Sequence, residues 1–541
     1  MTTLNTYFTT FEELQNFVHS HKIIDSKKLL IQVFSAQNNL IFLNDFVSYF
    51  QTHFPLSSLI GTTTDGEILA SSVTTLTTVI SFTIFESTTL QTYITDQFED
   101  SFESGQKLAN EIVLEDTKLI IAFIDGLNGN GEEFLQGIDS VAKNVKVAGG
   151  MSGDNATFSQ TFVFTKEKVV SKGIVGVALN SDKLNIYTDY SLNWGPVGKH
   201  LTITKVESNR VYTIDSRSAY DTYAYYLGDD IAKKLPMIGI VFPLIVERDG
   251  IEIARSVLVN NGDGSLTFAG NLKIGDIVRF GYGNSEHILN SSFTQIKKML
   301  DIPIESLFVF SCMARRRFMP DEIYHEIESF ASIAPTAGFF TYGEFFTKNN
   351  HKALLNQTMT ILALSEADKI TKTDLNLKNE YTITDDTTEA LSHLVSVTTK
   401  ELEEQKNYFE NFYNTRAFGI LIVDNTRKIL DVNPTFCDIL QYKRSELVGK
   451  NSLCIHINEE FYTKFGQIAF DKVNDNKSVD IDYQLRRKDG SLTWAKFSGE
   501  KMKNSDNILY VISDITNLKE ATNRLFKQKN EFETIYNGTK D

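Results

Sequence analysis

The sequence predicts a multidomain protein of the α/β and α+β classes, and three observations support this fold class. A turn of the form Gly-x-x-Thr-x-Gly-acid, GTTTDGE at residues 61–67, returns as GFFTYGE at residues 338–344. Both copies lie in the same order of strand, helix, strand, turn and strand. Residues 390–414 then run without Gly or Pro, and short alternating strands follow them. We therefore expect repeated units, a helical linker and a separate α+β domain.

The first repeated unit surrounds GTTTDGE. Residues 28–36, KLLIQVFSA, form an apolar run of strand length, and residues 38–54 carry apolar side chains at helical spacing. SSLIG (57–61) is predicted as a second strand and LTTVISFTIF (76–85) as a third. The same elements are predicted around a shortened motif, MSGD, and around GFFTYGE, at residues 117–125, 131–143, 145–154 and 161–179, and at residues 306–314, 321–333, 334–344 and 354–364.

Each turn places a glycine, a hydroxyl and a carboxylate at the end of a buried strand. The glycines are expected to permit a positive φ and a close approach of the backbone. Because repeated units usually align their equivalent loops on one side, we expect the three turns to converge. The alternative is that the hydroxyls and acids only cap local N–H groups. The candidate ligand-binding residues in the turns are Thr64, Gly66, Glu67, Ser152, Gly153, Asp154, Thr341, Gly343 and Glu344.

Several of these stretches, in this order, resemble the FIST family, a pair of sensory domains of signal-transduction proteins. Residues 28–180 resemble its N-terminal half in LIGTTTDGEI, DGLNGNGEEFLQGI and VAGGMSGDN. Residues 199–365 resemble its C-terminal half in NRVYTIDSRSAYDTYAYYLG, IARSVLVNNGDGSLTFAG, FSCMARR and TAGFFTYGEF. The resemblance implies that this part binds a small ligand, with amino acids as the suggested class.

A free amino acid requires a cation or N–H groups for its carboxylate and acidic groups for its ammonium. Arg255 lies inside a strand-like run, Arg315 follows a predicted strand, and Asn356 is polar within an apolar run. These three residues complete the candidate ligand site. The alternatives are a structural salt bridge for Arg255 and a solvated loop charge for Arg315. If the site is correct, substitution of Arg255 or Glu344 removes ligand binding without unfolding the domain.

The composition limits the cellular compartments and the classes of binding partner that we expect for the protein. The 541 residues include 53 Lys and Arg against 69 Asp and Glu, a net charge of −16, which disfavours nucleic acids and anionic membranes. Cys312, Cys437 and Cys454 have neither metal-site spacing nor a disulfide framework, which is consistent with a reducing compartment. No signal peptide is evident, and the apolar runs are too short to span a bilayer. We predict a cytoplasmic protein without a membrane span or a metal site.

Residues 386–413 are predicted to form a helical coiled-coil linker that joins two copies of the chain as a homodimer. The alternative is a lone amphipathic helix packed on its own domain. The predicted seam alternates steps of four and three residues. It consists of Leu391, Val395, Thr398, Leu402, Gln405, Phe409 and Phe412.

The following segment resembles a PAS domain in VNP (432–434), SELVGK (445–450), the KDGS turn before Trp494, and DIT (514–516). The resemblance implies a five-stranded antiparallel sheet. It also implies that Asp514, Ile515 and Thr516 relay a signal to an output helix. No cofactor is predicted. Cys454 lies outside any flavin-adduct motif, and His456 precedes the helix that would be expected to carry a haem ligand, so flavin and haem are both disfavoured. Cys437 and Trp494 are expected in the core.

A second repeat predicts that the protein continues. QKNYFENFYNT (405–415) leads into the PAS-like segment, and QKNEFETIYNGT (528–539) repeats it 123 residues further on. We therefore expect a second PAS domain and an output domain, a histidine kinase or a diguanylate cyclase, in a longer protein. The predicted boundaries are 1–190 and 191–385 for the two FIST domains, 386–413 for the linker, 414–517 for the PAS domain and 518–541 for an output helix.

These features predict the sensory input portion of a signal-transduction protein of the two-component type, without enzymatic activity in this chain. Two alternatives remain. The first is a hydrolase-like enzyme with Cys312 as nucleophile, which requires His325 nearby and a lowered thiol pKa. The second is a dimerisation scaffold that binds no ligand.

Overall fold

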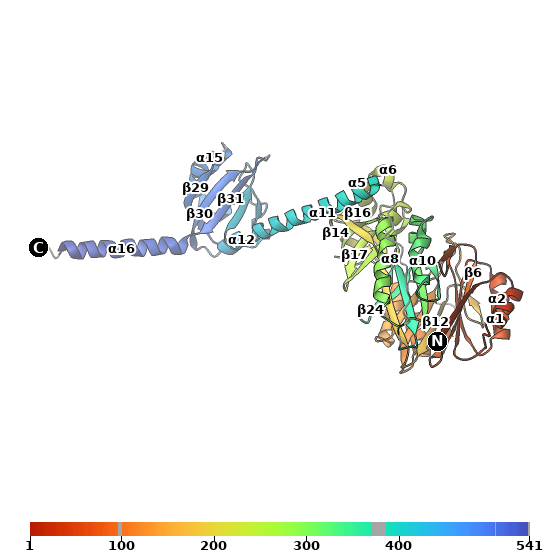
Figure 1. The fold of residues 1–541 in the computed structure, drawn as a ribbon. Helices are drawn as coiled ribbons and strands as arrows, with labels where there is room; N and C mark the ends of the chain where they lie inside the picture. Colours follow the sequence, from red (N-terminus) through yellow and green to blue (C-terminus); the bar gives the residue numbers. More distant parts are fainter. Residues whose placement is uncertain (96–99, 369, 371–385, 476, 504, 539–541) are drawn as a thin grey trace. The chain divides into compact units, whose positions relative to one another are not determined.

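The computed structural model describes residues 1–95, 100–368, 370, 386–475, 477–503 and 505–538 (Figure 1). The chain forms two compact units, Met1–Thr399 and Lys400–Asp541. Among the described residues, no helix combines the length and the apolar character needed to cross a bilayer.

The first unit contains three copies of one arrangement of strands and helices. The first copy comprises β1 (Thr2–Tyr7), α1 (Phe11–Ser20), β2 (Leu29–Ser35), α2 (Leu40–His53), β3 (Ser58–Thr63), β4 (Glu67–Leu69), β5 (Ser72–Thr74) and β6 (Thr78–Ile84). The second comprises β7 (Thr89–Ile94), α3 (Ser101–Ile112), β8 (Thr117–Ile124), α4 (Gly131–Val141), β9 (Lys146–Met151), β10 (Val163–Phe164), β11 (Val169–Val170) and β12 (Ile174–Asn180). The third comprises β13 (Asn185–Ser191), α8 (Ser285–Met299), β22 (Ser306–Cys312), α9 (Met313–Phe318), α10 (Ile323–Ala331), β23 (Thr336–Thr341), β24 (Glu344–Lys348), β25 (His351–Leu355) and β26 (Met359–Ser365).

The three copies exchange hairpins in a cycle. The three six-stranded sheets have the orders β1-β6-β2-β3-β10-β11, β7-β12-β8-β9-β24-β25 and β13-β26-β22-β23-β4-β5. Each sheet contains two parallel strands that a helix connects. The second of these strands pairs with a hairpin that comes from another copy. The first copy gives its hairpin to the third sheet, the second to the first and the third to the second. No copy therefore completes its sheet alone, and the three fold as one body.

The inner faces of the three sheets meet in a common aromatic core. Phe34 on β2, Phe123 on β8 and Phe339 on β23 are fully buried, and their ring centroids lie 5.2–6.0 Å apart. The outer faces pack against helices, with α1 and α2 on the first sheet (Figure 1). Burial on both faces explains why these strands read as continuous apolar runs rather than as alternating ones.

A large insertion separates β13 from α8 in the third copy. It contains β14 (Trp194–Glu207), β15 (Arg210–Ile214), β16 (Arg217–Ser218), α5 (Ala219–Leu227), α6 (Asp229–Ala232), α7 (Ile238–Val241), β17 (Leu244–Arg248), β18 (Ile251–Arg255), β19 (Val257–Asn260), β20 (Leu266–Phe268) and β21 (Ile277–Gly283). Its strands form an eight-stranded sheet of order β18-β17-β21-β14-β15-β20-β19, with β16 paired to β15.

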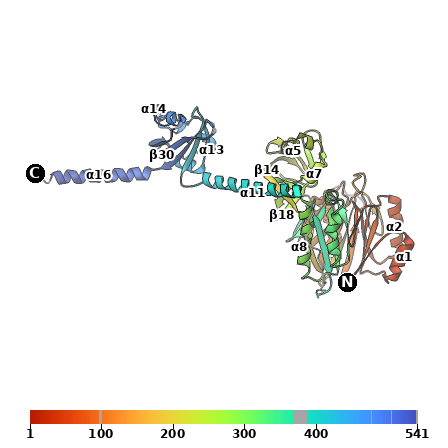
Figure 2. The ribbon, with the colours of Figure 1, turned by 45° about the horizontal axis from the view of Figure 1, so that its top comes forward.

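The second unit contains a five-stranded antiparallel sheet of order β28-β27-β31-β30-β29 (Figure 2). Its strands are β27 (Gly419–Val423), β28 (Ile429–Val432), β29 (Val479–Arg486), β30 (Leu492–Lys501) and β31 (Ile508–Asp514). Between β28 and β29 lie α12 (Pro434–Leu440), α13 (Arg444–Leu447), a 3-10 turn (Ser452–Ile455), α14 (Glu459–Phe465), a π-helical turn (Gly466–Phe470) and α15 (Asp471–Asn474). Helix α11 (Asp386–Tyr413) precedes the sheet, and α16 (Thr516–Gly538) follows it.

Several predicted boundaries differ from the observed elements. The boundary predicted at residue 190 falls within β13. The strand predicted at 306–314 ends at Cys312, and Arg315 lies in the short helix α9 rather than in a loop. Residues 371–385, at the end of the predicted second FIST domain, and residues 539–541, at the end of the predicted output helix, lie outside the described residues.

Candidate ligand-binding sites

The three Gly-rich turns lie side by side. The Gly153 amide donates to the carbonyl of Thr63 at 2.9 Å, and the Met151 amide donates to that of Gly343 at 2.8 Å. The Asp65 amide donates to the carbonyl of Phe340, also at 2.8 Å. Each turn is therefore hydrogen-bonded to both of the others. We call residues 63–67, 151–155 and 340–344 the hub.

The glycines of the hub serve mainly to allow close backbone approach. Gly66 has φ +123°, as expected, but Gly153 and Gly343 do not adopt positive φ, so that part of the prediction is wrong. A Cβ on Gly153 would lie 2.6 Å from the Asp65 amide nitrogen, and one on Gly343 would lie 2.9 Å from Leu354. The backbone of the first turn therefore leaves no room for a side chain at position 153, whereas position 343 faces the ends of the Leu354 and Met151 side chains.

Glu67 is fully buried and is held by donors from its own copy. Oε1 accepts from the Thr64 hydroxyl at 2.5 Å. Oε2 accepts from the Thr77 amide at 3.1 Å, the Thr77 hydroxyl at 2.9 Å and the Thr74 hydroxyl at 3.3 Å. Burial raises the pKa of Glu67 despite these bonds. Four internal donors thus engage this carboxyl group.

Asp154 organises the loop that follows its turn. It accepts from the hydroxyl of Tyr342 and, at 2.7 Å, from both the Thr157 hydroxyl and the Ser159 amide. Burial opposes ionisation of Asp154, but these bonds outweigh it and lower its pKa. Nearby, Ser152 accepts from the Thr62 hydroxyl at 2.7 Å, and Thr341 donates to the Met151 carbonyl at 2.6 Å.

Glu344 differs from the other hub acids because half of its carboxyl group has no partner. Oε2 accepts from the Thr358 hydroxyl at 2.5 Å, while Oε1 is buried and makes no hydrogen bond within the described residues. Burial raises the pKa of Glu344 well above its usual value. Burial and the neighbouring Glu344 likewise raise the thiol pKa of Cys312. Burial therefore favours the protonated form of both groups.

The raised thiol pKa contradicts a nucleophilic role for Cys312, because the reactive species is the thiolate. Cys312 is 4% exposed, so access is restricted as well. His325, the proposed base, lies 3.4 Å from Glu328. The direction of the Cys312 pKa is thus opposite to the one that the hydrolase-like alternative requires.

A charge cluster that sequence reasoning missed lies at the hub. Asp65, fully buried, forms ion pairs with Arg316 and, at 3.4 Å, with Arg317. Arg316 also donates to Asn155 at 3.1 Å, so it bridges two of the turns. Burial raises the pKa of Asp65, and the two arginines oppose this shift. The available signals in the sequence were the run of three arginines at 315–317 and the two acids of GTTTDGE, Asp65 and Glu67.

The two predicted arginines occupy separate places, and the protein's own acceptors surround both. Arg255 donates to Asn356 at 2.8 Å and pairs with Glu132 of α4, so the structure brings two predicted residues together. Arg315 forms a two-point ion pair with Glu326 of α10, and it donates to the carbonyl of Leu192 at 2.9 Å. Arg255, Arg315 and Glu326 are all fully buried. Each arginine is thus held by acceptors of the protein itself.

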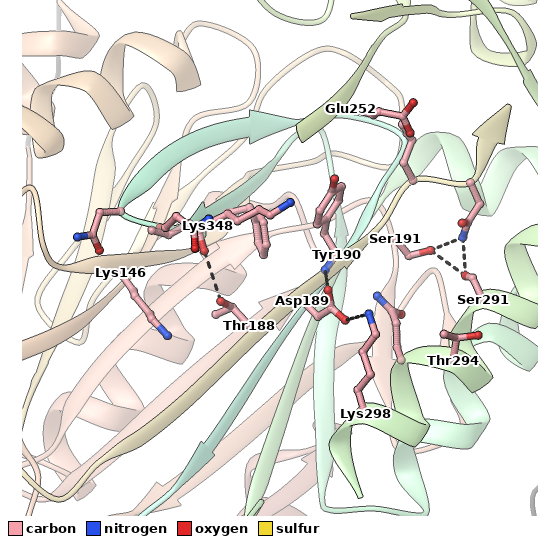
Figure 3. A pocket seen from close by; sticks show the side chains of 17 residues that line it. Lys146, Thr188, Asp189, Tyr190, Ser191, Glu252, Ser291, Thr294, Lys298 and Lys348 are labelled. Atoms are coloured by element: carbon pink, nitrogen blue, oxygen red, sulfur yellow. Dashed lines mark hydrogen bonds and ion pairs between the residues drawn. The ribbon is translucent and has the colours of Figure 1, made fainter. Parts of the chain in front are cut away.

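A cleft of about 910 Å³ lies elsewhere in the first unit, and it includes none of the twelve predicted ligand residues (Figure 3). Strand β13 contributes Asp189 and Tyr190, helix α8 contributes Ser291 and Lys298, and other elements supply the rest. The lining residues are Lys146, Thr188, Asp189, Tyr190, Ser191, Leu192, Asn193, Glu252, Ser291, Thr294, Gln295, Lys298, Phe346, Thr347, Lys348, Asn349 and Asn350. We call this space the cleft.

Aromatic rings and small hydroxyl groups line the middle of the cleft. The rings of Tyr190 and Phe346 lie 4.9 Å apart, and the hydroxyls of Ser191 and Ser291 are hydrogen-bonded at 2.9 Å. Sequence reasoning missed this site, because its residues come from five separate elements and the connections between them, and no motif marks them.

A small cavity of about 10 Å³ lies in the core of the second unit, bounded in part by Arg427, His456 and Tyr510. Arg427 Nη2, His456 Nδ1 and the Tyr510 hydroxyl have no partner among the described residues. Burial, together with Arg427, lowers the pKa of His456 to about 3. A volume of this size accommodates about one water molecule, which could bridge such groups.

The predicted relay triplet connects the sheet to α16. The Ile515 amide donates to the Trp494 carbonyl at 2.9 Å, and the Trp494 amide donates to the Thr516 hydroxyl at 3.0 Å. Asp514 accepts from the Thr516 amide at 2.9 Å and from Arg487 at 3.1 Å. The start of α16 is thus hydrogen-bonded directly to β30.

Comparison with known proteins identifies three domains. The model of the FIST N domain matches residues 29–217, that of the FIST C domain residues 219–347, and that of a PAS domain residues 417–517. An uncharacterized protein of Methanocaldococcus jannaschii is 23% identical over 423 residues, which cover 68% of this chain and 79% of that protein.

Similar solved structures cover the second unit. A domain of a sensory box sensor histidine kinase/response regulator from Geobacter sulfurreducens is 18% identical, covers 21% of this chain and 96% of that chain, and has a TM-score of 0.19. The PAS domain of an HTR-like protein from Haloarcula marismortui is 22% identical, covers 21% and 99%, and has a TM-score of 0.18. The chain is thus a FIST and PAS protein, in which a FIST N domain, a FIST C domain and a PAS domain, all sensory modules of signalling proteins, follow one another.

Proposed function

We propose that this chain is the sensory input part of a cytoplasmic signal-transduction protein. In this proposal the FIST domains bind a small ligand, for which the family suggests amino acids. The PAS domain and its flanking helices then pass the change to an output domain. A ligand shifts such an equilibrium only through different affinities for the two states.

The observation that carries this proposal is a repeated helical seam on both sides of the PAS domain. The seam of α11 returns in α16 at the same spacing of 123 residues, with apolar side chains, a small residue and a glutamine in equivalent places. The equivalent pairs are Val395 and Leu518, Thr398 and Ala521, Leu402 and Leu525, Gln405 and Gln528, Phe409 and Phe532, and Phe412 and Ile535. The side chains of Leu391, Thr398 and Ile535 lie outside the described residues.

The described apolar residues of the seam face solvent in the single chain. Leu402 and Phe409 are 58% and 61% exposed, and Leu525 and Phe532 are 67% and 77% exposed. Apolar residues at alternating steps of four and three on an isolated helix are typical of a two-stranded coiled coil. Gln405 and Gln528 interrupt the apolar seam at the same place in both helices.

The connection through Asp514, Ile515 and Thr516 supports the relay. Because the first turn of α16 is hydrogen-bonded to β30, a shift within the sheet is transmitted to the helix axis. Lys519 strengthens this connection through an ion pair with Asp482 at 2.6 Å. We therefore assign α16 as the output helix of the domain.

Cysteine cross-linking of the full chain tests the seam. Leu402→Cys and Leu525→Cys should each give a disulfide-linked dimer on mild oxidation. The matched controls, Asn407→Cys and Asn530→Cys, lie on the opposite side of each helix at the same 123-residue spacing and should cross-link poorly. Equal cross-linking of the seam and control positions, or a monomer by light scattering, would refute the proposed dimer.

A thermal-shift screen with amino acids and related metabolites tests ligand binding. A ligand at a hundred times its dissociation constant adds roughly 2.7 kcal/mol of stability. Saturable stabilisation supports a sensor. Complete silence, together with cross-linked dimers, favours the ligand-free scaffold.

A further inference from the structure

We propose that the cleft binds a small organic anion, a carboxylate or a phosphate ester, through Lys146 and Lys348, with Gln295 as a second polar contact. This inference rests on the proposed ligand-binding role of the first unit and names its site and its chemical class. The hub residues are not part of this site.

The size and position of the cleft suit a metabolite. Its volume of about 910 Å³ lies in the range of small-molecule sites. Side chains of β13 and α8 and of the hairpin β24–β25 border the same space (Figure 3). Asn349 and Asn350 form the tight turn of this hairpin, with φ values of 49° and 63°. Strands of three sheets and one helix thus frame the site.

The charges of the cleft favour an anion. The cleft is lined by three lysines, Lys146, Lys298 and Lys348, and by two acids, Asp189 and Glu252. Lys298 pairs with Asp189 at 3.5 Å. Lysines thus outnumber acids by one among the lining residues, in a chain whose net charge is −16.

Two of the lysines have no carboxylate partner within the part of the chain that the structure describes. The Lys146 ammonium donates to the Ile186 carbonyl and the Lys348 ammonium to the Gly250 carbonyl, both at 3.1 Å. Each ammonium has three donors, so two remain for a ligand on each lysine. Burial lowers the pKa of Lys146, and a bound anion would offset that cost by stabilising its charged form.

Gln295 supplies the independent observation. It is 4% exposed, and both its amide nitrogen and its amide oxygen lack a partner among the described residues. Buried amides are normally hydrogen-bonded, so an unpaired one that lines a cleft indicates a missing partner. The nitrogen can donate to an anion, and the oxygen can accept from a hydroxyl, amide or ammonium group of the same ligand.

Calorimetric titration of the full chain tests the proposal, with succinate, L-glutamate, glycerol 3-phosphate and, as a cation, putrescine, each to 20 mM. We expect saturable binding of at least one anion and none of putrescine. The double variant Lys146→Met/Lys348→Met should bind that anion at least tenfold more weakly. Lys297→Met, on the same helix as Lys298 but outside the cleft, should bind it as the unmodified chain does.

Each outcome decides a distinct point. Binding of the carboxylates or of the phosphate ester identifies which anion the site prefers. No anion binding, or equal binding by the double variant and Lys297→Met, would overturn the proposal. If the thermal-shift screen then finds a neutral or cationic ligand, the proposed sensory function is supported. Only the proposal that the ligand is an anion is then wrong.

Discussion

The hub and the cleft are both polar regions of the FIST-containing unit, but they differ in where their polar groups find partners. In the hub, Glu67 and Asp154 are surrounded by donors of the protein itself, and Asp65 is paired with two arginines. In the cleft, Lys146 and Lys348 donate to backbone carbonyls and form no ion pair within the described residues. Most polar groups of the hub are satisfied within the protein, with Oε1 of Glu344 as an exception, whereas the unused donors and acceptors of the cleft indicate a place for a ligand.

Among the substitutions of buried polar residues, removal of the Arg315 side chain should reduce the stability of the fold most. Arg315→Met leaves Glu326 buried without its counter-charge, so we expect a loss of about 3–5 kcal/mol in the free energy of unfolding. Denaturant unfolding of the full chain measures it. The double variant Arg315→Met/Glu326→Leu should recover much of the loss, because no charge then stays buried. Equal stability of Arg315→Met and the unmodified chain would contradict a structural role.

Glu344→Gln should have a pH-dependent effect of intermediate size. Because the folded state raises the pKa of Glu344, it retains a proton that the unfolded chain releases above about pH 4.5. The stability that this group contributes is complete below that pH and is lost as the pH rises, at about 1.4 kcal/mol per unit. The glutamine variant lacks this loss, so its advantage should grow from pH 5 to pH 7. Parallel stability curves for the two proteins would show an ionised Glu344.

Gln295→Leu should give the smallest change in stability. The variant should be more stable than the unmodified chain but should bind the anion more weakly. Leucine of similar size removes two unpaired buried polar atoms, so the ligand-free chain should gain about 1 kcal/mol. The same change should weaken anion binding, because the ligand loses a hydrogen-bond partner. Thermal unfolding and calorimetric titration of one preparation measure both. A stability loss with unchanged binding would place Gln295 among the structural residues.

The sequence predicted the repeated units because their strands and helices have local signatures. The cyclic exchange of hairpins could not be predicted in this way. The pairing of β4 with β23, for example, joins segments that are more than 260 residues apart, and periodicity carries no information on such partners. The insertion of an eight-stranded sheet between β13 and α8 was missed for the same reason.

The turn motifs located the hub, but they did not reveal what the hub residues contact. Arg255 and Asn356 meet as one pair, yet Glu132 of α4 completes their network, and nothing near it in sequence indicates this. The cleft had no signal at all, because Lys146 and Lys348 come from different copies of the unit. Only the folded chain brings such residues to one space.

The most direct test of the account is to compare anion binding by Glu344→Gln and by Lys146→Met/Lys348→Met in the same titration. We predict that Glu344→Gln keeps the affinity of the unmodified chain within twofold, while the lysine variant loses at least tenfold. The reverse pattern, with binding lost in Glu344→Gln and kept in the lysine variant, would place the ligand at the hub and contradict the assignment of the cleft.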